Sequence, residues 1–201
     1  MNYFPMFLNL AGRRVLICGG GRHAQEKIAR LLPFSPRLHV ICAQISDEIK
    51  AMDGIVTEER PFCAGDLEPA PAFVVAAEEP GLSEQIAALC RARHIPVNAV
   101  DLPELCDFIF PSLVCTQQLC VGVSTGGASP TAAIYLKEQI GDLLPSRIDE
   151  ILQWLPQARQ TVKHRLPEAE VRRTLRALVE RAFAEDRPLT DGELETFLKN
   201  P

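Results

Sequence analysis

Two short segments of the chain carry residues suited to chemistry, and the first is Val97–Asp101. It is predicted to be an apolar strand that delivers one carboxylate, Asp101, onto a loop. Ligands of open α/β sheets bind at the carboxyl ends of the strands, so a carboxylate there is suited to accept a proton. Capping of the turn before Pro103 is the alternative role for Asp101. A further strand is expected over Phe108–Phe110, closed by Pro111.

The second segment is a glycine-rich turn, residues 19–24, with the sequence GGGRHA. It fits the pattern G-x-G-x-x-A between an expected strand and an expected helix, which is the context that dinucleotide binding requires. Gly19 permits a tight turn, Gly21 lets the backbone approach a pyrophosphate, and Ala24 lets helix and strand pack closely. The helix N-terminus then offers N–H groups to the phosphates. A glycine turn with a purely structural role is the alternative.

The end of the second expected strand lacks the acidic residue that usually contacts the ribose of a dinucleotide. The strand ends in Cys42, Ala43 and Gln44, and the Gln44 side chain could hydrogen-bond the ribose instead. Asp47 and Glu48 come later, in a predicted helix start where capping is the simpler role. The residue types therefore do not choose between NAD and NADP.

A second glycine-rich junction between a strand and a helix spans residues 125–130. Its backbone N–H groups and helix dipole would suit a carboxylate or a phosphate, and an ordinary loop is the alternative. The hydroxyls of Ser124, Thr125 and Ser129 have no histidine close in sequence, so nucleophilic catalysis has little support.

The elements that must position these residues alternate between strands and helices. Strands are expected over 14–18, 38–42, 54–57, 72–77 and 97–100, and helices over 22–32 and 82–93. This alternation predicts an α/β fold, a Rossmann-type doubly wound parallel sheet. A hairpin of 113–116 with 119–124 and a helix over about 131–144 follow, and the remaining helices are separated by Pro145, Pro156, Pro167 and Pro188.

We expect three regions along the chain: an NAD-binding Rossmann domain over 1–112, a small hairpin-plus-helix dimerisation region over 113–145, and a helical C-terminal region over 146–201. One short hairpin has too little apolar strand to close a second core. A homodimer whose hairpins pair about a two-fold axis would supply the missing partner.

Composition and charge narrow the class of protein. The 201 residues are 47% hydrophobic and 23% charged, which is typical of a globular protein, and no apolar run is long enough to span a membrane. The N-terminus does not read as a signal peptide, and the seven cysteines form no CxxC pair, so a cytoplasmic protein with reduced thiols is expected. Four widely separated histidines argue against a metal site. A net charge of −5 argues against nucleic acid as a partner.

Five ordered motifs resemble the precorrin-2 dehydrogenase family, the amino-terminal module of siroheme synthases that also occurs as a free-standing protein. The motifs lie at 3–7, at the glycine turn with Glu26 and Lys27, at 98–101, at 108–112 and at 123–130. The resemblance implies NAD-dependent oxidation of precorrin-2 to sirohydrochlorin. In some members ferrous iron is also inserted, giving siroheme, and no residue of this sequence separates the two activities. Members are homodimers joined through the part beyond residue 112.

The resemblance also implies roles for particular residues. Asp101 is the catalytic residue; the cofactor contacts fall on Gly19, Gly20, Gly21, Arg22, His23, Ala43 and Gln44, and the substrate contacts on Ser124, Thr125, Gly126 and Gly127. On charge balance alone, and not from the resemblance, cations of the C-terminal helices are further candidates for the substrate's carboxylates: Arg159, Lys163, Arg165 or Arg172. The stretch 77–80, Ala-Glu-Glu-Pro, departs from the family's usual Ala-Thr and puts one cofactor contact in question.

Two other functions are kept open. A nucleotide-sensing regulatory module would share the sheet and the glycine turn, but it would retain the acid after the second strand and has no need of the Asp101 segment. A non-catalytic member of the family would bind tetrapyrrole without oxidising it, and binding of cofactor without turnover would identify it.

Overall fold

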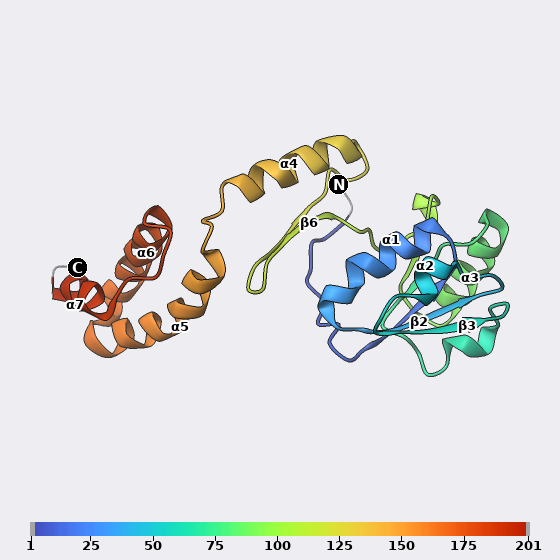
Figure 1. The fold of residues 1–201 in the computed structure, drawn as a ribbon, viewed down its shortest axis with the longest axis horizontal. Coiled ribbons are helices and arrows are strands. Elements are labelled where there is room, and N and C mark those ends of the chain that lie inside the picture. Colours follow the sequence, from blue (N-terminus) through green and yellow to red (C-terminus); the bar gives the residue numbers. More distant parts are fainter. Residues whose placement is uncertain (1–2, 200–201) are drawn as a thin grey trace. The chain divides into compact units, whose positions relative to one another are not determined.

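A computed structural model describes residues 3–199 of the chain. The chain divides into two compact units, of which the first ends at Phe110 and the second begins at Pro111. Figure 1 shows the course of the chain through both units.

The first unit contains a five-stranded, all-parallel sheet in the order β3-β2-β1-β4-β5. The strands are β1 (Arg14–Cys18), β2 (Arg37–Cys42), β3 (Ile55–Glu59), β4 (Val74–Ala76) and β5 (Val97–Ala99). The helices are α1 (Arg22–Leu31), α2 (Asp47–Lys50) and α3 (Pro80–Ala92), with 3₁₀ turns η1 (Leu32–Phe34), η2 (Ala64–Leu67) and η3 (Pro103–Leu105). The predicted Rossmann-type sheet is confirmed. Its strand order reverses between β1 and β4, and in this fold class the ligand crevice lies at that point.

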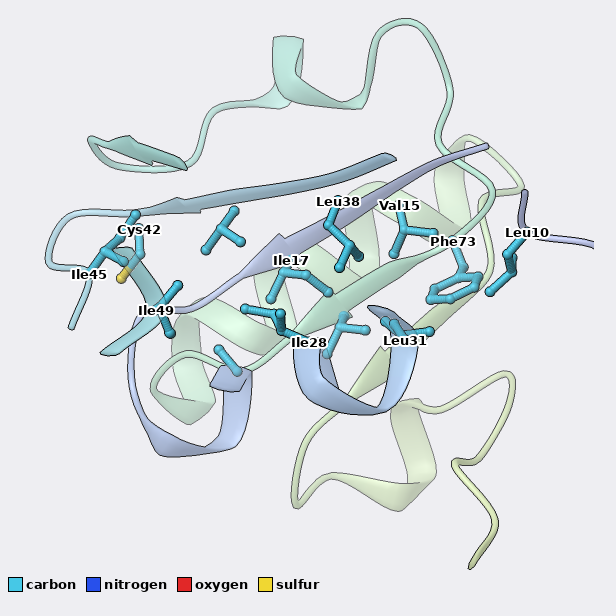
Figure 2. Packing of buried hydrophobic residues seen from close by; sticks show 13 residues of the cluster. Leu10, Val15, Ile17, Ile28, Leu31, Leu38, Cys42, Ile45, Ile49 and Phe73 are labelled. Atoms are coloured by element: carbon cyan, nitrogen blue, oxygen red, sulfur yellow. The ribbon is translucent and has the colours of Figure 1, made fainter. Parts of the chain in front are cut away.

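The sheet is buried on both faces, which explains why its strands are continuous apolar runs rather than alternating patterns. Val15 and Ile17 of β1 face α1, where Ile28 and Leu31 meet them in one core cluster (Figure 2). Leu16 of β1 points to the opposite face and packs in a second cluster with residues of α3. Packing on both faces of the sheet therefore holds β1, and with it the carboxyl end of this strand, in position.

The predicted strand over Phe108–Phe110 is wrong, because within residues 3–199 this segment pairs with no other strand. Its aromatic residues pack on the α1 side of the sheet instead, and the rings of Phe108 and Phe73 lie 4.8 Å apart, edge to face. The Phe108 carbonyl accepts a hydrogen bond of 2.9 Å from Asn98 Nδ2. An apolar segment that packs against the core thus resembles a strand in sequence without pairing as one.

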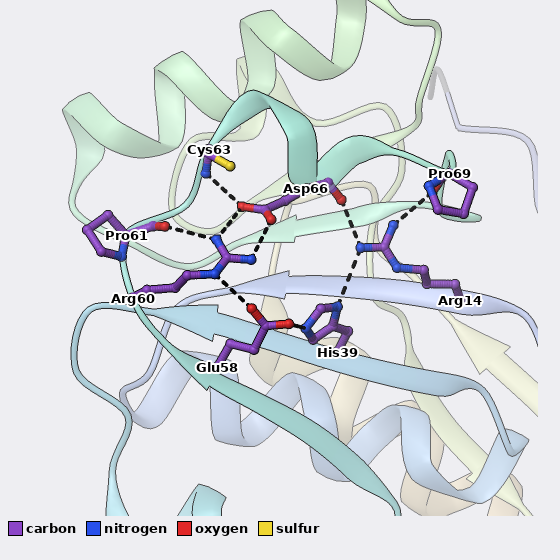
Figure 3. Close-up of polar contacts among 8 residues, drawn as sticks. All are labelled: Arg14, His39, Glu58, Arg60, Pro61, Cys63, Asp66 and Pro69. Carbon is purple, nitrogen blue, oxygen red and sulfur yellow. Dashed lines mark hydrogen bonds and ion pairs between the residues drawn. The ribbon is translucent and has the colours of Figure 1, made fainter.

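A loop with the short turn η2 joins β3 to β4, and a polar network ties this loop to the sheet (Figure 3). Arg60 donates two hydrogen bonds to the Asp66 carboxylate, at 2.6 and 2.9 Å, and one of 2.7 Å to Glu58. Arg14 of β1 donates to the carbonyls of Asp66 and Pro69, both at 2.8 Å. The loop is held by charge-assisted bonds rather than by an amphipathic helix.

Replacement of Asp66 by Asn is expected to remove part of the acid sensitivity of folding. The Arg60 guanidinium, aided by the Cys63 N–H, lowers the pKa of Asp66 from 3.8 to about 2. Because the folded pKa lies below the unfolded one, the carboxylate stabilises the fold above about pH 4, and this contribution is lost as the pH falls toward 2. Its size is on the order of 1–2 kcal/mol.

Urea unfolding of the wild type and of Asp66→Asn across this acid range measures the effect, with Asp53→Asn as a surface control. The free energy of unfolding of Asp66→Asn should fall less steeply with acidification than that of the wild type. Parallel curves for the two proteins would contradict the assignment.

The second unit begins with an antiparallel hairpin of β6 (Ser112–Cys115) and β7 (Cys120–Val123), as predicted. Four helices follow: α4 (Pro130–Asp142), α5 (Ile148–Arg165), α6 (Glu168–Ala184) and α7 (Asp191–Lys199). A small core of Val162, Leu178, Leu189, Leu194 and Leu198 joins α5, α6 and α7. Pro145, Pro167 and Pro188 lie between helices, as predicted.

The predicted helix break at Pro156 is wrong, because α5 continues through this residue. A proline inside a helix removes one backbone hydrogen bond and costs about 3 kcal/mol. Fully buried residues on both sides of it, Ile151, Ala158 and Val162, keep the two halves of the helix packed. Tertiary packing therefore overrides the local preference.

Candidate dinucleotide-binding and catalytic site

The glycine turn connects β1 to α1, and its three glycines differ in what surrounds them. Gly19 has a φ of +148°, and a Cβ on it would lie 2.7 Å from the Ala77 carbonyl oxygen, just beyond β4. A Cβ on Gly20 would lie 1.9 Å from the Gln44 carbonyl oxygen, just beyond β2. A Cβ on Gly21 would meet nothing within 4 Å. The first two glycines let the turn pack between neighbouring strand ends, and the third leaves its backbone open to a ligand.

The N-terminus of α1 is not capped by a side chain. Gly21 is the N-cap residue and offers no side-chain acceptor, whereas Ser129 at the start of α4 accepts from the Ala132 N–H at 3.1 Å. The first N–H groups of α1 therefore have no partner within the helix, and they carry its positive dipole end. This end, with open space over Gly21, fits the pyrophosphate of a dinucleotide.

The first turn of α1 brings two charged or titratable side chains to this site. Arg22 is 87% exposed and its Nε donates to Glu26 Oε1 at 3.0 Å. His23 Nε2 lies 3.8 Å from Asp101 Oδ2. The carboxylate that follows β5 thus lies next to the helix that starts at the glycine turn.

The backbone after β5 presents Asp101 to solvent. A turn closes when the Leu102 N–H donates to the Ala99 carbonyl at 3.2 Å, and Asp101 has a left-handed φ of +63° within it. Aspartate and asparagine tolerate this conformation better than most residues. The side chain is 81% exposed. The N-cap of η3 is Leu102, with no side-chain hydrogen bond, so capping of that turn is not the role of Asp101.

The loop that carries Asp101 is tied back to β5. The Asp107 carboxylate accepts from the Val97 N–H at 2.9 Å, and the Asp107 N–H donates to the Val97 carbonyl at 2.8 Å. The buried Asn98 side chain holds the Phe108 carbonyl, as described above. These bonds fix both ends of the loop and leave the Asp101 carboxylate free to contact a ligand.

The end of β2 supplies the residues expected beside the ribose. Ala43 and Gln44 are exposed, and the Ser46 N–H donates to the Gly20 carbonyl at 2.9 Å, which joins this strand end to the glycine turn. Glu78, just beyond β4, lies by the Cys42 thiol; burial and a hydrogen bond with Glu78 raise the pKa of Cys42. The altered stretch 77–80 therefore brings a carboxylate to the end of β2, where the usual acid is missing. The position of Glu78 directly after an expected strand could have indicated from the sequence that this carboxylate lies at the edge of the sheet.

Lys27, like Glu78, is a residue to which the sequence pattern assigned no binding or catalytic role. It lies one helical turn after His23, and its Nζ stands 4.7 Å from the centroid of the Phe110 ring. Burial, and then the positive charge of Arg30, lower the pKa of Lys27. The spacing of four residues from His23 could have indicated that both side chains share one face of the helix.

The proposed substrate turn belongs to the second unit, whereas the dinucleotide turn belongs to the first. Thr125 Oγ1 donates to the Ser129 carbonyl at 3.0 Å and accepts from its N–H at 3.1 Å. Ser124 Oγ accepts from the Gly126 N–H at 3.1 Å, and Gly126 and Gly127 have φ values of +65° and +90°. The hydroxyls shape this turn, which positions it at the N-terminus of α4.

Two features are absent from the described part of the chain. No group of three or more His, Cys, Asp or Glu residues among 3–199 could hold a metal ion. No helix in the same range is long and apolar enough to cross a membrane.

A parallel sheet in this order, with an uncapped glycine turn at its reversal point, defines the dinucleotide-binding class of α/β proteins. Sequence comparison agrees with this class. The family model described as "Putative NAD(P)-binding" matches residues 6–112, more than half of the chain. The chain belongs to this NAD(P)-binding family.

Curated relatives make the resemblance more specific. The siroheme synthase of Thioalkalivibrio sulfidiphilus (strain HL-EbGR7) is 35% identical over 176 residues, which cover 86% of this chain and 36% of that protein. The siroheme synthase of Nitrosococcus oceani is 31% identical over 208 residues, covering 99% of this chain and 44% of that protein. The chain thus spans less than half the length of these relatives.

A solved structure described as "SirC, precorrin-2 dehydrogenase" has a similar fold. It matches with a TM-score of 0.67 and 22% identity, and the match covers 98% of both chains. At this identity the likeness establishes the fold.

Proposed function

We propose that the chain catalyses the NAD-dependent oxidation of precorrin-2 to sirohydrochlorin. The observation that carries this proposal is the exposed Asp101 carboxylate, 3.8 Å from His23 on the helix whose uncapped N-terminus suits a pyrophosphate. The names of the relatives, siroheme synthase and precorrin-2 dehydrogenase, support the choice of substrate.

The oxidation removes a hydride and a proton from the tetrapyrrole. NAD supplies the hydride acceptor when bound. We assign its pyrophosphate to the turn of Gly19, Gly20 and Gly21, in which the Gly19 N–H already donates to the Ile41 carbonyl at 3.2 Å. The Arg22 side chain lies nearby, and we assign the ribose to Ala43, Gln44 and Glu78. Asp101 accepts the proton, and His23 lies beside this carboxylate, with its Nε2 3.8 Å from Asp101 Oδ2.

The carboxylates of the substrate require cations and N–H donors. In the first unit Lys27 is available, half-buried against Phe110. In the second unit we assign this role to the turn of Ser124, Thr125, Gly126 and Gly127, and to Arg159 and Lys163, which line a shallow groove on α5. Arg165 is a weaker candidate because Glu195 already accepts two of its hydrogen bonds.

Ferrous iron is proposed as a second substrate, inserted after the oxidation. The tetrapyrrole brings four nitrogen ligands of its own, so the reaction needs no protein cage for the metal. Asp101 can then accept the pyrrole protons that iron displaces. We place the protein in the cytoplasm, which fits its buried free thiols Cys18, Cys42 and Cys90.

We further propose that the chain is a homodimer in which α4 contributes to the interface. This helix buries only Ala133 within the described chain, while Ile134, Tyr135 and Leu136 are 49%, 60% and 47% exposed. Large apolar residues exposed around this helix favour its burial against a second copy.

A Leu136→Glu substitution is therefore expected to convert the dimer to a monomer, because a charge would be buried at the interface. Light scattering after size-exclusion chromatography measures the mass directly. Glu138→Gln on the same helix serves as the matched control and should leave the mass unchanged. A monomeric wild type, or a dimer unaffected by Leu136→Glu, would rule out this interface.

Anaerobic assays with NAD⁺ or NADP⁺ and freshly prepared precorrin-2 test the proposed reaction. We expect sirohydrochlorin and NADH to form together, with a preference for NAD⁺, and siroheme to appear after ferrous iron is added. Cofactor binding without turnover would instead identify a nucleotide-sensing module or a non-catalytic tetrapyrrole-binding protein.

A further inference from the structure

Two of the seven cysteines lie opposite each other on the hairpin of the second unit. Cys115 ends β6, Cys120 begins β7, and the strand register pairs them directly. Their Sγ atoms are 2.6 Å apart. Both thiols are free, as are the other five.

The register places this pair where a disulfide fits the backbone. The Thr116 N–H donates to the Leu119 carbonyl at 2.8 Å, so residues 116 and 119 form a hydrogen-bonded pair. Pairs alternate along an antiparallel ladder, so 115 and 120 form a non-hydrogen-bonded pair, with Cα atoms about 4.5 Å apart. Disulfides span Cα separations of about 4.4–6.8 Å, so the sulfurs can join without rearranging the strands.

The pair is also accessible, unlike most thiols of this chain. Cys115 is exposed and Cys120 is partly exposed, whereas Cys18, Cys42 and Cys90 are buried in the core of the first unit. Cys63 is the other exposed thiol, and it lies on the loop between β3 and β4, in the other unit. Two accessible thiols within bonding reach distinguish the hairpin from a lone surface cysteine.

We propose that Cys115 and Cys120 form a reversible cross-strand disulfide, with a low-molecular-weight disulfide such as oxidised glutathione as the oxidant. The thiolate of one cysteine attacks the small disulfide, whose S–S bond breaks and releases one thiolate as a mixed disulfide forms. The second cysteine loses its proton and attacks the protein sulfur of the mixed disulfide, releasing the second small thiol. Two protein thiols lose two electrons, and one small disulfide becomes two thiols.

The environment of the pair makes oxidation slow near neutral pH. Partial desolvation of the Cys115 sulfur and the neighbouring Cys120 thiol raise the pKa of Cys115, so little thiolate is present to attack. Oxidation is therefore expected to accelerate as the pH rises. Such a thiol stays reduced in a reducing compartment and responds when small disulfides accumulate.

The hairpin tip gives the modification a structural consequence. Asp149, in the first turn of α5, accepts hydrogen bonds from the Thr116 hydroxyl and from the N–H groups of Gln117 and Gln118, at 2.5, 3.2 and 2.8 Å. A disulfide at the base of this turn removes freedom from the segment that binds α5. The cross-link would thus secure the contact between the hairpin and the helices of the second unit.

The test uses the full-length reduced protein, incubated with oxidised glutathione at neutral and at alkaline pH. Free thiols are then alkylated and the peptides are sequenced by mass spectrometry. We expect Cys115 and Cys120 to escape alkylation together, joined within one chain and restored by dithiothreitol, and the reaction to be faster at alkaline pH.

Variants separate this result from general thiol oxidation. Cys63→Ser should leave the cross-link intact, whereas Cys115→Ser and Cys120→Ser should each leave the remaining thiol with a persistent glutathione adduct. Full alkylation of both cysteines in the wild type, or a cross-link between two chains, would overturn the proposal. The wild-type measurement decides this even if a variant folds poorly, and it does not depend on the proposed dehydrogenase activity.

Discussion

Asp101→Asn is expected to lower the rate of precorrin-2 oxidation by about 10²–10⁴-fold, the usual contribution of a general base, while NAD affinity stays unchanged. The substitution keeps the size of the side chain and removes its ability to accept a proton. Asparagine also tolerates the left-handed φ of +63° at this position, so the turn after β5 should keep its shape. The steady-state rate under anaerobic conditions and the dissociation constant for NAD measure the two effects separately.

Asp107→Asn provides the matched control for this experiment. Its amide oxygen can still accept the Val97 N–H that holds the same loop, so activity should stay close to that of the wild type. Full activity of Asp101→Asn would end the assignment of Asp101 as the proton acceptor. Equal losses in both variants would show that the shape of the loop, rather than the Asp101 carboxylate, matters.

The glycine turn predicts opposite results for two neighbouring substitutions. Gly20→Ala puts a Cβ 1.9 Å from the Gln44 carbonyl and 2.8 Å from the Ile45 Cα, both backbone atoms that cannot easily move. We expect it to destabilise the first unit by about 3 kcal/mol or more. Gly21→Ala meets nothing within 4 Å, and Gly21 has a φ of −102° that alanine adopts freely. It should leave stability nearly unchanged but weaken NAD binding about tenfold or more, because its methyl group occupies the space assigned to the pyrophosphate.

Thermal unfolding and calorimetric titration with NAD distinguish these two outcomes. Loss of NAD affinity in a stably folded Gly21→Ala protein would support the turn as the phosphate site. Unchanged affinity in that variant would place the pyrophosphate elsewhere, and a stable Gly20→Ala protein would contradict the close approach of the turn to the end of β2.

The fold of the first unit could largely be predicted because its signals are local. Apolar runs such as Val15–Cys18, each followed by a turn and an amphipathic helix, identify parallel strands without knowledge of their partners. The strand predicted over Phe108–Phe110 is wrong because an apolar segment packed against a core edge has the same residue types as a short strand. The helix break predicted at Pro156 is wrong because the packing of α5 on other helices is not visible in the local sequence.

The candidate site likewise has features that the sequence reveals and contacts that it does not reveal. The glycine turn and the place of Asp101 at a strand end follow from residue order, but the approach of Asp101 to His23 depends on how β5 and α1 are arranged in space. The proximity of Glu78 to Cys42 depends on the neighbouring strands, and the burial of Lys27 on the Phe110 ring depends on a loop far along the chain. Such contacts between distant segments carry no local signature.

In the proposed reaction the tetrapyrrole gives up its hydride to NAD in the crevice beside Asp101. Anaerobic turnover of precorrin-2 deuterated at the ring-system carbon that is oxidised tests this most directly, with mass analysis of the nicotinamide product. We predict one deuterated NADH for each sirohydrochlorin formed. In the same time, Asp101→Asn should form almost no sirohydrochlorin and almost no deuterated NADH. Sirohydrochlorin formed without deuterium in the nicotinamide ring would rule out direct hydride transfer to NAD.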